Sequence, residues 1–575
     1  PRESECLWKK KLWRIRNPVH NALVRIETTG SIDTNDFGHE QQFMRTTRFL
    51  SSLPFCLLTV IVVVGVVDCR IGIAKEPRNA RLHNMLVINE DNSHFFSSRK
   101  PEDMTLKGLH AWVDQYAGSS VTHLFLCSTA MRASFRSKSR DAIWDPVNGK
   151  EPQDRWPQNA KRLHEAGLDP YKIWIARCRD RKISPWLSMR MNDVHNTEDR
   201  DNFQHSTFWR THIKFWREPN HEHGSGLNYA YPEVRRYQMA FVRELLERYD
   251  PDGLELDWMR FPNHLTPGKE REERQILTRF VRDVRRLTRE WSRKRKHPIL
   301  LGVRAPAHPD AAAGLGMDAM EWARQGLVDL IVPCPFYFSS DFDIPVELWH
   351  QGLKNAPNPV AVVPGLESSV RPWISGTPVG NTLETLYGFA ASGNHRGADG
   401  VYLFNWMDTN NWPVPGNDYK LVLKHGVGTR FVTTAARRHP VCFRDAVPAG
   451  FSMNVQLPAD ARLGKTFRMH IGPRPDSGTA WAIVGLAKRD GLSESRFRAK
   501  LNGQSLETAA DLTNLKQLGG NSARAVRFAC PLNVLKTGYN DLDLRQVAGS
   551  TGQQIVWVEL RMDPGPETGP SNRQD

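Results

Sequence analysis

Cysteine is scarce in this chain and follows no recognisable pattern. The 575 residues include eight cysteines, of which three fall before residue 70. The other five are scattered, odd in number and never spaced as CxxC, so a disulfide framework and a cysteine-based metal cluster are both disfavoured. A bridge between Cys442 and Cys530 is one alternative, which an oxidising compartment would permit, and buried free thiols are the other.

Other chemical signatures are also missing. No glycine-rich phosphate fingerprint follows the first strand-like segment, which disfavours a dinucleotide-binding sheet. His221, Glu222 and His223 alternate in a glycine-flanked stretch without the HExxH spacing of a zinc helix, and an ordinary polar loop is the favoured interpretation. The sequence therefore predicts neither a metal nor a cofactor.

Positive charge is abundant, with a formal net charge of +15. Much of it lies in residues 273–298, where apolar residues recur at helical spacing, so the Arg and Lys side chains are expected on the solvated back of an amphipathic helix. No nucleic-acid-binding motif accompanies the charge, and no nucleic acid partner is expected. The 18 tryptophans suggest aromatic binding surfaces.

The amino-terminal part has the pattern of an export signal. Residues 1–43 are interpreted as an extension from a start codon placed too early. From Met44, two arginines precede an apolar run over 49–67, and Gly72-Ile73-Ala74 has the small-x-small form of a cleavage site. A signal peptide at 44–74 predicts a periplasmic, cell-envelope or extracellular protein. The alternative is an uncleaved anchor, since the run of about 19 residues could just span a bilayer; this would be the only membrane contact.

Between residues 80 and 430, short apolar runs alternate with helical patterns. Eight such units in about 350 residues are typical of a (β/α)8 TIM barrel, with a doubly wound open sheet as the alternative. The predicted helices include 101–116, 232–249, 269–296, 317–325 and 382–392. The predicted strands are 85–89, 122–127, 185–191, 253–258, 299–305, 330–337, 360–367 and 400–406.

The pattern changes after residue 430 to short alternating strands and turns. Segments 497–506, 523–532, 535–547 and 554–564 predict an all-β sandwich over 440–564. "LNG" and the later "LKTGYNDLDL" resemble the galactose-binding-like jelly rolls that accompany many polysaccharide-degrading enzymes. The Pro- and Gly-rich end, 565–575, is expected to be a disordered tail.

In a barrel, the functional face lies at the carboxyl ends of the strands. Carboxylates there can act as acid, base or nucleophile, and aromatic faces can stack on sugar rings, so the cluster predicts a carbohydrate site. Besides three candidate catalytic acids, the predicted substrate-binding residues are Asp91, Arg190, Asn192, Asp193, Arg260, Arg304, Tyr337, Asn405, Trp406 and Asp408. The long segment 192–232 is expected to cover the substrate.

The segment 227–262 resembles the glycosyl-hydrolase-like 10 group, in which an "NPEVR" helix leads into a "YDVDGIHLDYIRYP" strand. The resemblance implies a (β/α)8 barrel that cleaves glycosidic bonds. It departs at Glu255, where a neutral residue or His is expected, and in the first-strand ending EDNSHFF. The matching residues are Pro232, Glu233, Val234, Arg235, Tyr249, Asp250, Asp252, Gly253, Asp257, Arg260 and Pro262.

Three acids are the candidate catalytic residues. Asp257, at the last inward position of strand four, is a nucleophile or general acid; its structural alternative is an ion pair with Arg260. Glu255 lies one inward layer deeper, since the strand period is two, and is expected either to act in catalysis or to pair with Arg190 or Arg304. Glu367 ends strand seven, and strands four and seven carry the two carboxylates in a large clan of retaining barrel glycosidases, although that clan has Asn where this chain has Leu254.

These observations predict an exported glycoside hydrolase that acts on a poly- or oligosaccharide through paired carboxylates. The arginines at the mouth favour an anionic polysaccharide. The alternative is a non-catalytic carbohydrate-binding protein of the cell envelope, because a barrel fold does not imply activity. Two acids that converge across the mouth would favour the enzyme.

Overall fold

The computed structural model describes residues 82–218, 226–336, 339–409 and 416–563. All of them belong to one compact unit, 74–575. The predicted leader, the predicted tail and Tyr337 lie outside the described residues, and the boundary between the two predicted domains stays a prediction. Within the described residues, no helix has the length and apolar character needed to span a bilayer.

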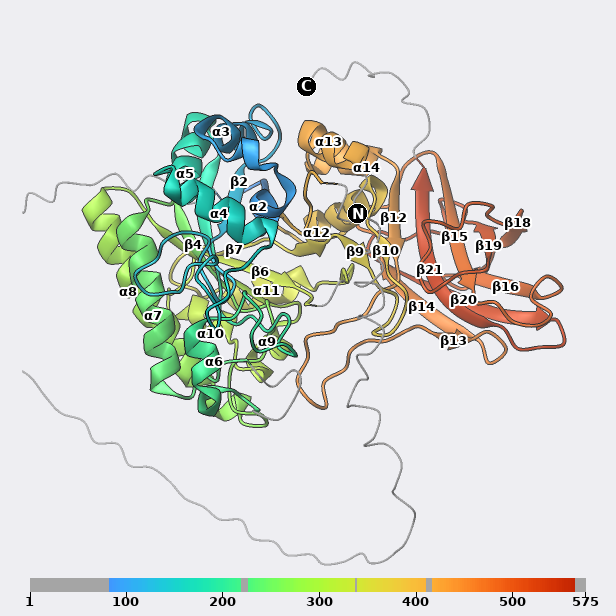
Figure 1. The fold of residues 1–575 in the computed structure, drawn as a ribbon. Helices are drawn as coiled ribbons and strands as arrows, with labels where there is room; N and C mark the ends of the chain where they lie inside the picture. The colour runs from blue at the N-terminus through green and yellow to red at the C-terminus, as the bar shows by residue number, and fades with distance from the viewer. Residues whose placement is uncertain (1–81, 219–225, 337–338, 410–415, 564–575) are drawn as a thin grey trace, which may run out of the picture. The chain divides into compact units, whose positions relative to one another are not determined.

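A parallel sheet surrounded by helices forms the first part of the fold (Figure 1). Each predicted strand appears within a few residues of its expected place. Apart from β7 and β8, consecutive strands are separated by helices, which is the alternation that the sequence predicts. In chain order the strands are β1 (Met85–Glu90), β2 (His123–Cys127), β3 (Ser184–Arg190), β4 (Gly253–Asp257), β5 (Leu300–Pro306), β6 (Leu330–Cys334), β7 (Ala361–Val362), β8 (Gly365–Glu367) and β11 (Gly400–Phe404).

The sheet closes into a barrel through an interrupted seventh strand. β7 pairs with β6, and β8 pairs with β11, which in turn pairs with β1. Val363 and Pro364 separate the two segments; Val363 N still donates to Ile331 O, whereas Pro364 O accepts from Tyr402 N. Proline has no amide hydrogen for the ladder. β7 and β8 therefore act together as strand seven of a (β/α)8 barrel, and the predicted continuous strand 360–367 is corrected to two segments.

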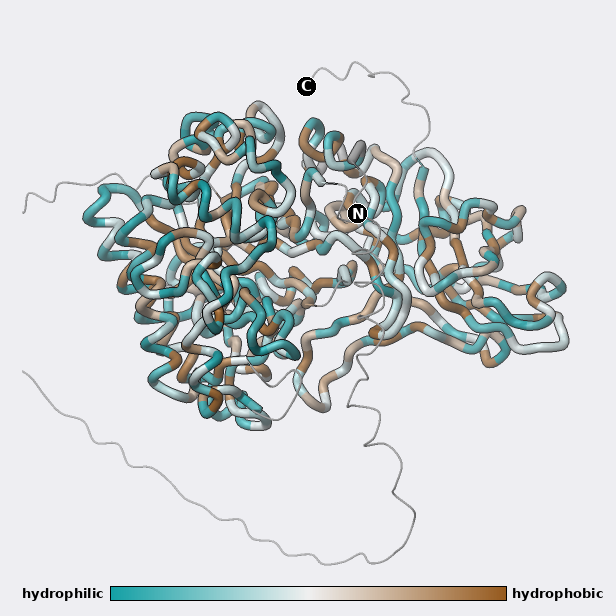
Figure 2. The backbone as a smooth tube through the Cα atoms, viewed as in Figure 1, coloured by the Kyte–Doolittle hydropathy of each residue, from teal (hydrophilic) through white to brown (hydrophobic). Residues whose placement is uncertain are grey.

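Helices cover the outside of the barrel (Figure 1), and hydrophobic and hydrophilic residues are mixed along them (Figure 2). Buried hydrophobic residues of the strands and helices form one core cluster. The longest helix, α8, has acids in its first turn and Arg and Lys in its last, which complements the helix dipole. Its apolar stripe is buried, as predicted. The helices are α2 (His94–Ser98), α3 (Leu106–Asp114), α4 (Arg155–Glu165), α5 (Pro170–Asp180), α6 (Thr207–Thr211), α7 (Pro232–Arg248), α8 (Glu270–Arg295), α9 (Pro309–Gly314), α10 (Ala319–Arg324), α11 (Val346–Leu353), α12 (Leu383–His395), α13 (Gly416–His425) and α14 (Thr429–Thr434), with 3-10 turns η3 (Pro101–Asp103) and η4 (Ile213–Phe215).

Inward-facing side chains fill the barrel in layers. In the lower layer the Trp186 ring stacks on Phe125, with ring centroids 4.7 Å apart. Gly253 leaves room for that indole, because a Cβ there would lie 2.4 Å from Trp186. The next two residues of the same parity on β3 are Ser188 and Arg190, so polar groups lie above an apolar plug.

A second part contains two antiparallel sheets whose inner faces share one apolar core. This is the predicted β-sandwich. A six-stranded sheet contains β12 (Arg437–Pro440), β13 (Ala459–Asp460), β15 (Thr479–Leu486), β18 (Glu507–Ala509), β19 (Arg524–Ala529) and β21 (Gln554–Asp563). A four-stranded sheet contains β14 (Lys465–His470), β16 (Arg496–Leu501), β17 (Gln504–Ser505) and β20 (Tyr539–Ala548), and a small hairpin joins β9 (Ser369–Val370) to β10 (Val379–Gly380).

One expectation about side chains is corrected, and one open alternative is decided. Many of the tryptophans lie in the hydrophobic core. The fully buried side chains include Trp174, Trp186, Trp209, Trp258, Trp322, Trp349, Trp406 and Trp557. Trp186 fills the lower interior of the barrel, and the other rings belong to the main core cluster rather than to a binding surface. Cys442 and Cys530 are separate buried thiols, not a bridge; Cys442 Sγ contacts Asp341 Oδ1 at 3.3 Å.

Candidate active site at the barrel mouth

The register of three neighbouring strands places a carboxylate between two arginines. Asp257 at the end of β4 is the Cα partner of Arg190 on β3 and of Arg304 on β5. Residues in register on adjacent strands point to the same side of the sheet. The row Arg190, Asp257 and Arg304 therefore forms part of the uppermost layer of the barrel, here called the mouth.

Both carboxylate oxygens of Asp257 accept hydrogen bonds. Its Oδ2 accepts a hydrogen bond from Arg304 Nη1 at 2.9 Å, and its Oδ1 accepts from the backbone amides of Met259 (3.0 Å) and Arg260 (3.1 Å). The side-chain partner is thus Arg304, and not the predicted Arg260 guanidinium. A carboxylate offers about four acceptor positions, so these three donors fix its orientation and leave one position for a reactant or water.

Glu255 lies one layer below Asp257 and makes no ion pair with Arg190 or Arg304, contrary to that expectation. Its Oε2 accepts from Ser188 Oγ at 2.6 Å and from Tyr402 Oη at 3.0 Å, while its Oε1 is buried without a partner. Burial, followed by the charge of Asp257, raises the pKa of Glu255 well above its usual range. This environment favours the protonated form of Glu255, which lies beneath the ion pair of Asp257 and Arg304.

Glu367 presents a different environment at the same mouth. It is the Cα partner of Phe404 on β11, and the Phe404 ring lies 3.9 Å from the Arg304 guanidinium carbon. The Glu367 carboxyl accepts from Ser368 N (2.8 Å), Ser368 Oγ (3.0 Å) and Asn405 Nδ2 (2.9 Å). These donors are neutral. Burial raises the pKa of Glu367, although these hydrogen bonds and the charge of Arg260 oppose the shift. This environment favours a protonated carboxyl group.

A chain of charges runs along the opposite rim of the mouth. Arg190 pairs with Asp91 and, at 3.0 Å, with Asp193. His195 Nδ1 lies 2.6 Å from Asp193 Oδ1, and Arg260 Nη2 lies 2.8 Å from His195 Nε2. Arginine can only donate, so Nε2 accepts and Nδ1 carries the proton. The network fixes the tautomer of His195 and aims the half-buried Arg260 at the mouth.

The charges in this network keep its acids ionised. Although burial opposes it, the Arg190 and Arg260 guanidinium groups hold the pKa of Asp91 below its usual range. The pKa of Asp193 is lowered in the same way, with His195 and Arg190 as the main partners. Two arginines and two carboxylates at one rim make a polar, hydrogen-bonding edge that suits a hydroxyl-rich or carboxylate-bearing ligand.

Three predicted substrate-binding residues, Asn192, Trp406 and Asp408, take structural positions, and a fourth, Asn405, reaches the mouth. Asn192 bonds to the backbone of Leu227 and Asn263, which ties the long segment 192–232 to the loop after β4. Trp406 is fully buried and its Nε1 donates to Glu367 O at 3.2 Å. Asp408 pairs with Arg99 and with His94. Asn405 is brought to the mouth through its contact with Glu367, at a positive φ of 60°.

The segment after β12 also reaches the mouth. Both carboxylate oxygens of Asp445 accept from Phe336 N, at 2.9 and 3.1 Å. Ala446 packs in a small apolar cluster with Met259, Cys334 and Phe336, which follow or end strands four and six. A residue more than a hundred positions after β6 thus covers one side of the mouth, and the sequence contains no local signal for it.

Sequence reasoning missed several residues of the site. Tyr402 and Phe404 line the interior next to Glu255 and Arg304, and Asn89 Nδ2 supports the Tyr402 hydroxyl at 2.6 Å. The alternation within GVYLFNW would have found Tyr402 and Phe404, because they share the inward parity of the last strand. His195 was predicted only as part of the covering segment.

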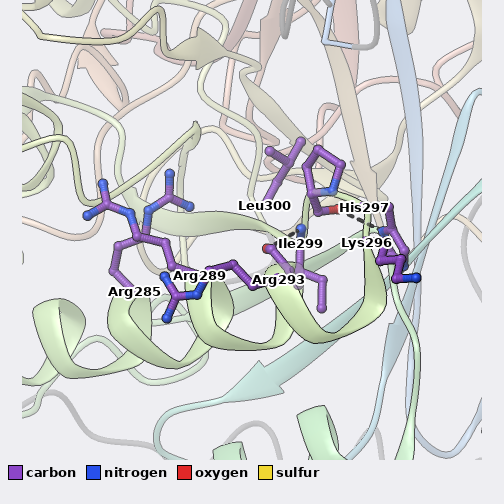
Figure 3. A pocket seen from close by; sticks show the side chains of 9 residues that line it. Arg285, Arg289, Arg293, Lys296, His297, Ile299 and Leu300 are labelled. Atoms are coloured by element: carbon purple, nitrogen blue, oxygen red, sulfur yellow. Dashed lines mark hydrogen bonds between the residues drawn. The ribbon is translucent and has the colours of Figure 1, made fainter. Parts of the chain in front are cut away.

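A cavity of about 400 Å³ lies elsewhere, at the start of β5 (Figure 3). Helix α8 lines one side of the cavity, and the lining residues include Arg285, Arg293 and Lys296. Leu300, which lines it, is at the opposite end of β5 from Arg304, so this cavity is not the mouth. In the part of the chain that the structure describes, no group of three or more His, Cys, Asp or Glu side chains is arranged to hold a metal ion.

Neither a family model nor a curated protein matches this chain. Among solved structures, it is similar to a cycloisomaltooligosaccharide glucanotransferase from Paenibacillus sp. (10% identity, 84% of this chain and 57% of that chain, TM-score 0.31). It is also similar to a family 18 N-acetylglucosaminidase from Paenibacillus barengoltzii (10%, 59% and 99%, 0.32). A third is the glycoside hydrolase domain of PgaB (BpsB) from Bordetella bronchiseptica (11%, 60% and 99%, 0.35).

This chain therefore spans little more than half of the glucanotransferase, and 51% of an alpha-L-fucosidase isoenzyme 2 from Paenibacillus thiaminolyticus. The TM-scores all lie below 0.5. The assignment of a barrel rests on the strand pairing described above, and any function rests on the residues of the mouth.

Proposed function

We propose that this protein is a glycoside hydrolase that cleaves a poly- or oligosaccharide at the barrel mouth. The observation that carries the proposal is the contrast between two carboxyl groups of that mouth. Asp257 accepts from a guanidinium and two amides, whereas Glu367 is buried among neutral donors and its pKa is raised. Acid-assisted glycoside cleavage requires a carboxyl group that favours its protonated form, as Glu367 does, and a second carboxyl group fixed in orientation, as Asp257 is.

In this mechanism Glu367 donates its proton to the glycosidic oxygen as the bond from that oxygen to the anomeric carbon breaks. Asp257 either attacks the anomeric carbon or takes a proton from the water that does so. Arg304 orients Asp257 through a hydrogen bond to its Oδ2. Glu255 lies one layer below, where burial favours its protonated form. Arg260 donates hydrogen bonds to sugar hydroxyl or carboxylate groups, and Asp91 accepts hydrogen bonds from sugar hydroxyl groups.

The proposal is tested by release of reducing sugar from neutral, uronic and sulfated polysaccharides. The parent, Asp257→Asn and Glu367→Gln are compared, with Asp252→Asn as the matched control. Asp252 lies before β4 and pairs with Arg179 rather than with the mouth. Activity that disappears in both mouth variants and persists in the control supports the hydrolase. Full activity in Asp257→Asn would overturn it.

One observation favours the alternative of a non-catalytic carbohydrate-binding protein. The side chain of Asp257 is 2% exposed and that of Arg304 is 3% exposed. The ion pair is therefore as inaccessible to solvent as an ion pair with a purely structural role. Under this alternative no polysaccharide is cleaved, and binding survives Asp257→Asn. Measuring binding and cleavage on the same polymer separates the two functions.

Export is part of the proposal. The apolar run 49–67 and Gly72-Ile73-Ala74 support secretion or anchoring at the cell envelope, where polysaccharide substrates are found. Fractionation of cells that express the full chain tests this: protein found only in the cytoplasmic fraction would contradict it.

A further inference from the structure

The outer face of the four-stranded sheet carries an exposed set of basic side chains. Alternate residues of β20 and β16 point into the sandwich core, as Leu542, Leu544 and Ala499 do, so the residues between them point outward. Figure 1 shows β14, β20 and β16 in one sheet. The outward cations, here called the basic face, are Arg468, Arg496, Arg498, Lys500 and Arg545, accompanied by Asp541 and Asp543.

The register places one pair of like charges on this face, and it also places Arg468 opposite Asp541. Arg498 and Arg545 are direct Cα partners on β16 and β20. Such residues lie about 5 Å apart, and like charges at that spacing destabilise a sheet. Lys500 is the partner of Asp543, but Asp543 accepts from Thr466 Oγ1 at 2.5 Å instead. Within the described residues, no ion pair joins the cations of this face to its two aspartates.

The basic face extends to the loops on the carboxyl side of the barrel. Arg468 stacks on the ring of Tyr539, with its guanidinium carbon 3.7 Å from the ring centroid. The Tyr539 hydroxyl donates to Asp343 Oδ1 at 2.7 Å, and Asp343 lies in the connection between β6 and α11. A polymer on the face would therefore lead toward the side of the barrel where Asp257 and Glu367 lie.

We propose that the basic face binds an acidic polysaccharide with one carboxylate per sugar, a polyuronate, and holds it beside the barrel. Guanidinium groups match carboxylates in shape and charge. The spacing of Arg496, Arg498 and Lys500 along one strand, about 6.6 Å from one to the next, suits a polymer with separated charges. Asp541 and Asp543 lie among the cations, which disfavours densely charged sulfated glycans and nucleic acids.

This inference builds on the proposed function, but its test measures binding alone, so each can fail without the other. The full chain carrying Asp257→Asn is titrated with polygalacturonate, dextran, dextran sulfate and duplex DNA at two salt concentrations. A face variant combines Arg498→Gln, Lys500→Gln and Arg545→Gln. The control combines Arg474→Gln, Lys488→Gln and Lys516→Gln, which are exposed basic residues outside this sheet and change the net charge equally.

We expect polygalacturonate to bind the parent and the control equally, and the face variant roughly tenfold more weakly, because three charge contacts are lost. Salt should weaken the binding, and dextran should not bind. The face variant should fold as stably as the parent, since it removes the repulsion between Arg498 and Arg545. Equal polygalacturonate binding by parent and face variant would overturn the proposal, as would tighter binding of dextran sulfate or DNA through the same residues. A change in oligomeric state caused by the face variant would also overturn it.

Discussion

Replacing Glu255 with Gln tests the electrostatics of the barrel interior. Glu255 is fully buried, one of its oxygens has no partner, and its pKa is raised to about 8 by burial and by Asp257. The unfolded chain loses this proton near pH 4.3. Between these two values the folded state binds one more proton than the unfolded state, so the stability of the parent falls as the pH rises. The slope is about 1.4 kcal/mol per pH unit.

Glutamine has no such proton to lose. From pH 5.5 to 7.5 the stability of Glu255→Gln should therefore rise by about 3 kcal/mol relative to the parent. Denaturant unfolding at several pH values measures this difference. Glu244→Gln is the matched control. Hydrogen bonds from Ser137, Lys138 and Ser139 lower the pKa of Glu244 although burial opposes them. The change in the free energy of unfolding that Glu244→Gln causes should therefore be the same throughout that pH range. If the free energies of unfolding of the parent and of Glu255→Gln changed equally with pH, the reasoning would be refuted.

Two further substitutions probe the layers around this acid. Gly253→Ala should destabilise the fold by about 1–3 kcal/mol, because its Cβ would lie 2.4 Å from Trp186, whereas Gly428→Ala, with nothing within 4 Å, should not; equal unfolding midpoints would contradict the packing. Arg304→Met should cost about 3–5 kcal/mol by leaving Asp257 buried without its partner. Adding Asp257→Asn should recover part of that loss, and additive losses in the double variant would show that the pair is not coupled.

The barrel could be predicted from the sequence because each strand is a short apolar run bounded by helical patterns. The two-residue period of a strand also predicted that Glu255 and Asp257 lie on the same face of β4. The partners of these acids could not be predicted, since they depend on register: Arg304 meets Asp257 because β4 and β5 pair without an offset between these two residues. Pro364 marks the break in strand seven, although nothing local shows that the barrel closes through both halves.

The contribution of distant segments was beyond prediction. Asp445 reaches Phe336 from a loop that follows β12, and only the docking of that loop on Met259 and Cys334 brings them together. Asp408 lies four residues after the end of β11 and pairs with Arg99 and His94. The high number of tryptophans suggested binding surfaces. Large aromatic rings also fill the core between the barrel and its helices, and the number of tryptophans alone does not distinguish these two roles.

The division of roles between Glu367 and Asp257 is tested most directly by the dependence of cleavage on the leaving group. Glu367→Gln and Asp257→Asn are assayed on the active polysaccharide and on aryl glycosides of the same sugar whose phenols need no protonation to leave. If Glu367 is the general acid, its variant loses cleavage of the polysaccharide but keeps much of that of the activated glycosides, while Asp257→Asn loses both. Equal loss on both substrates by Glu367→Gln would contradict the account.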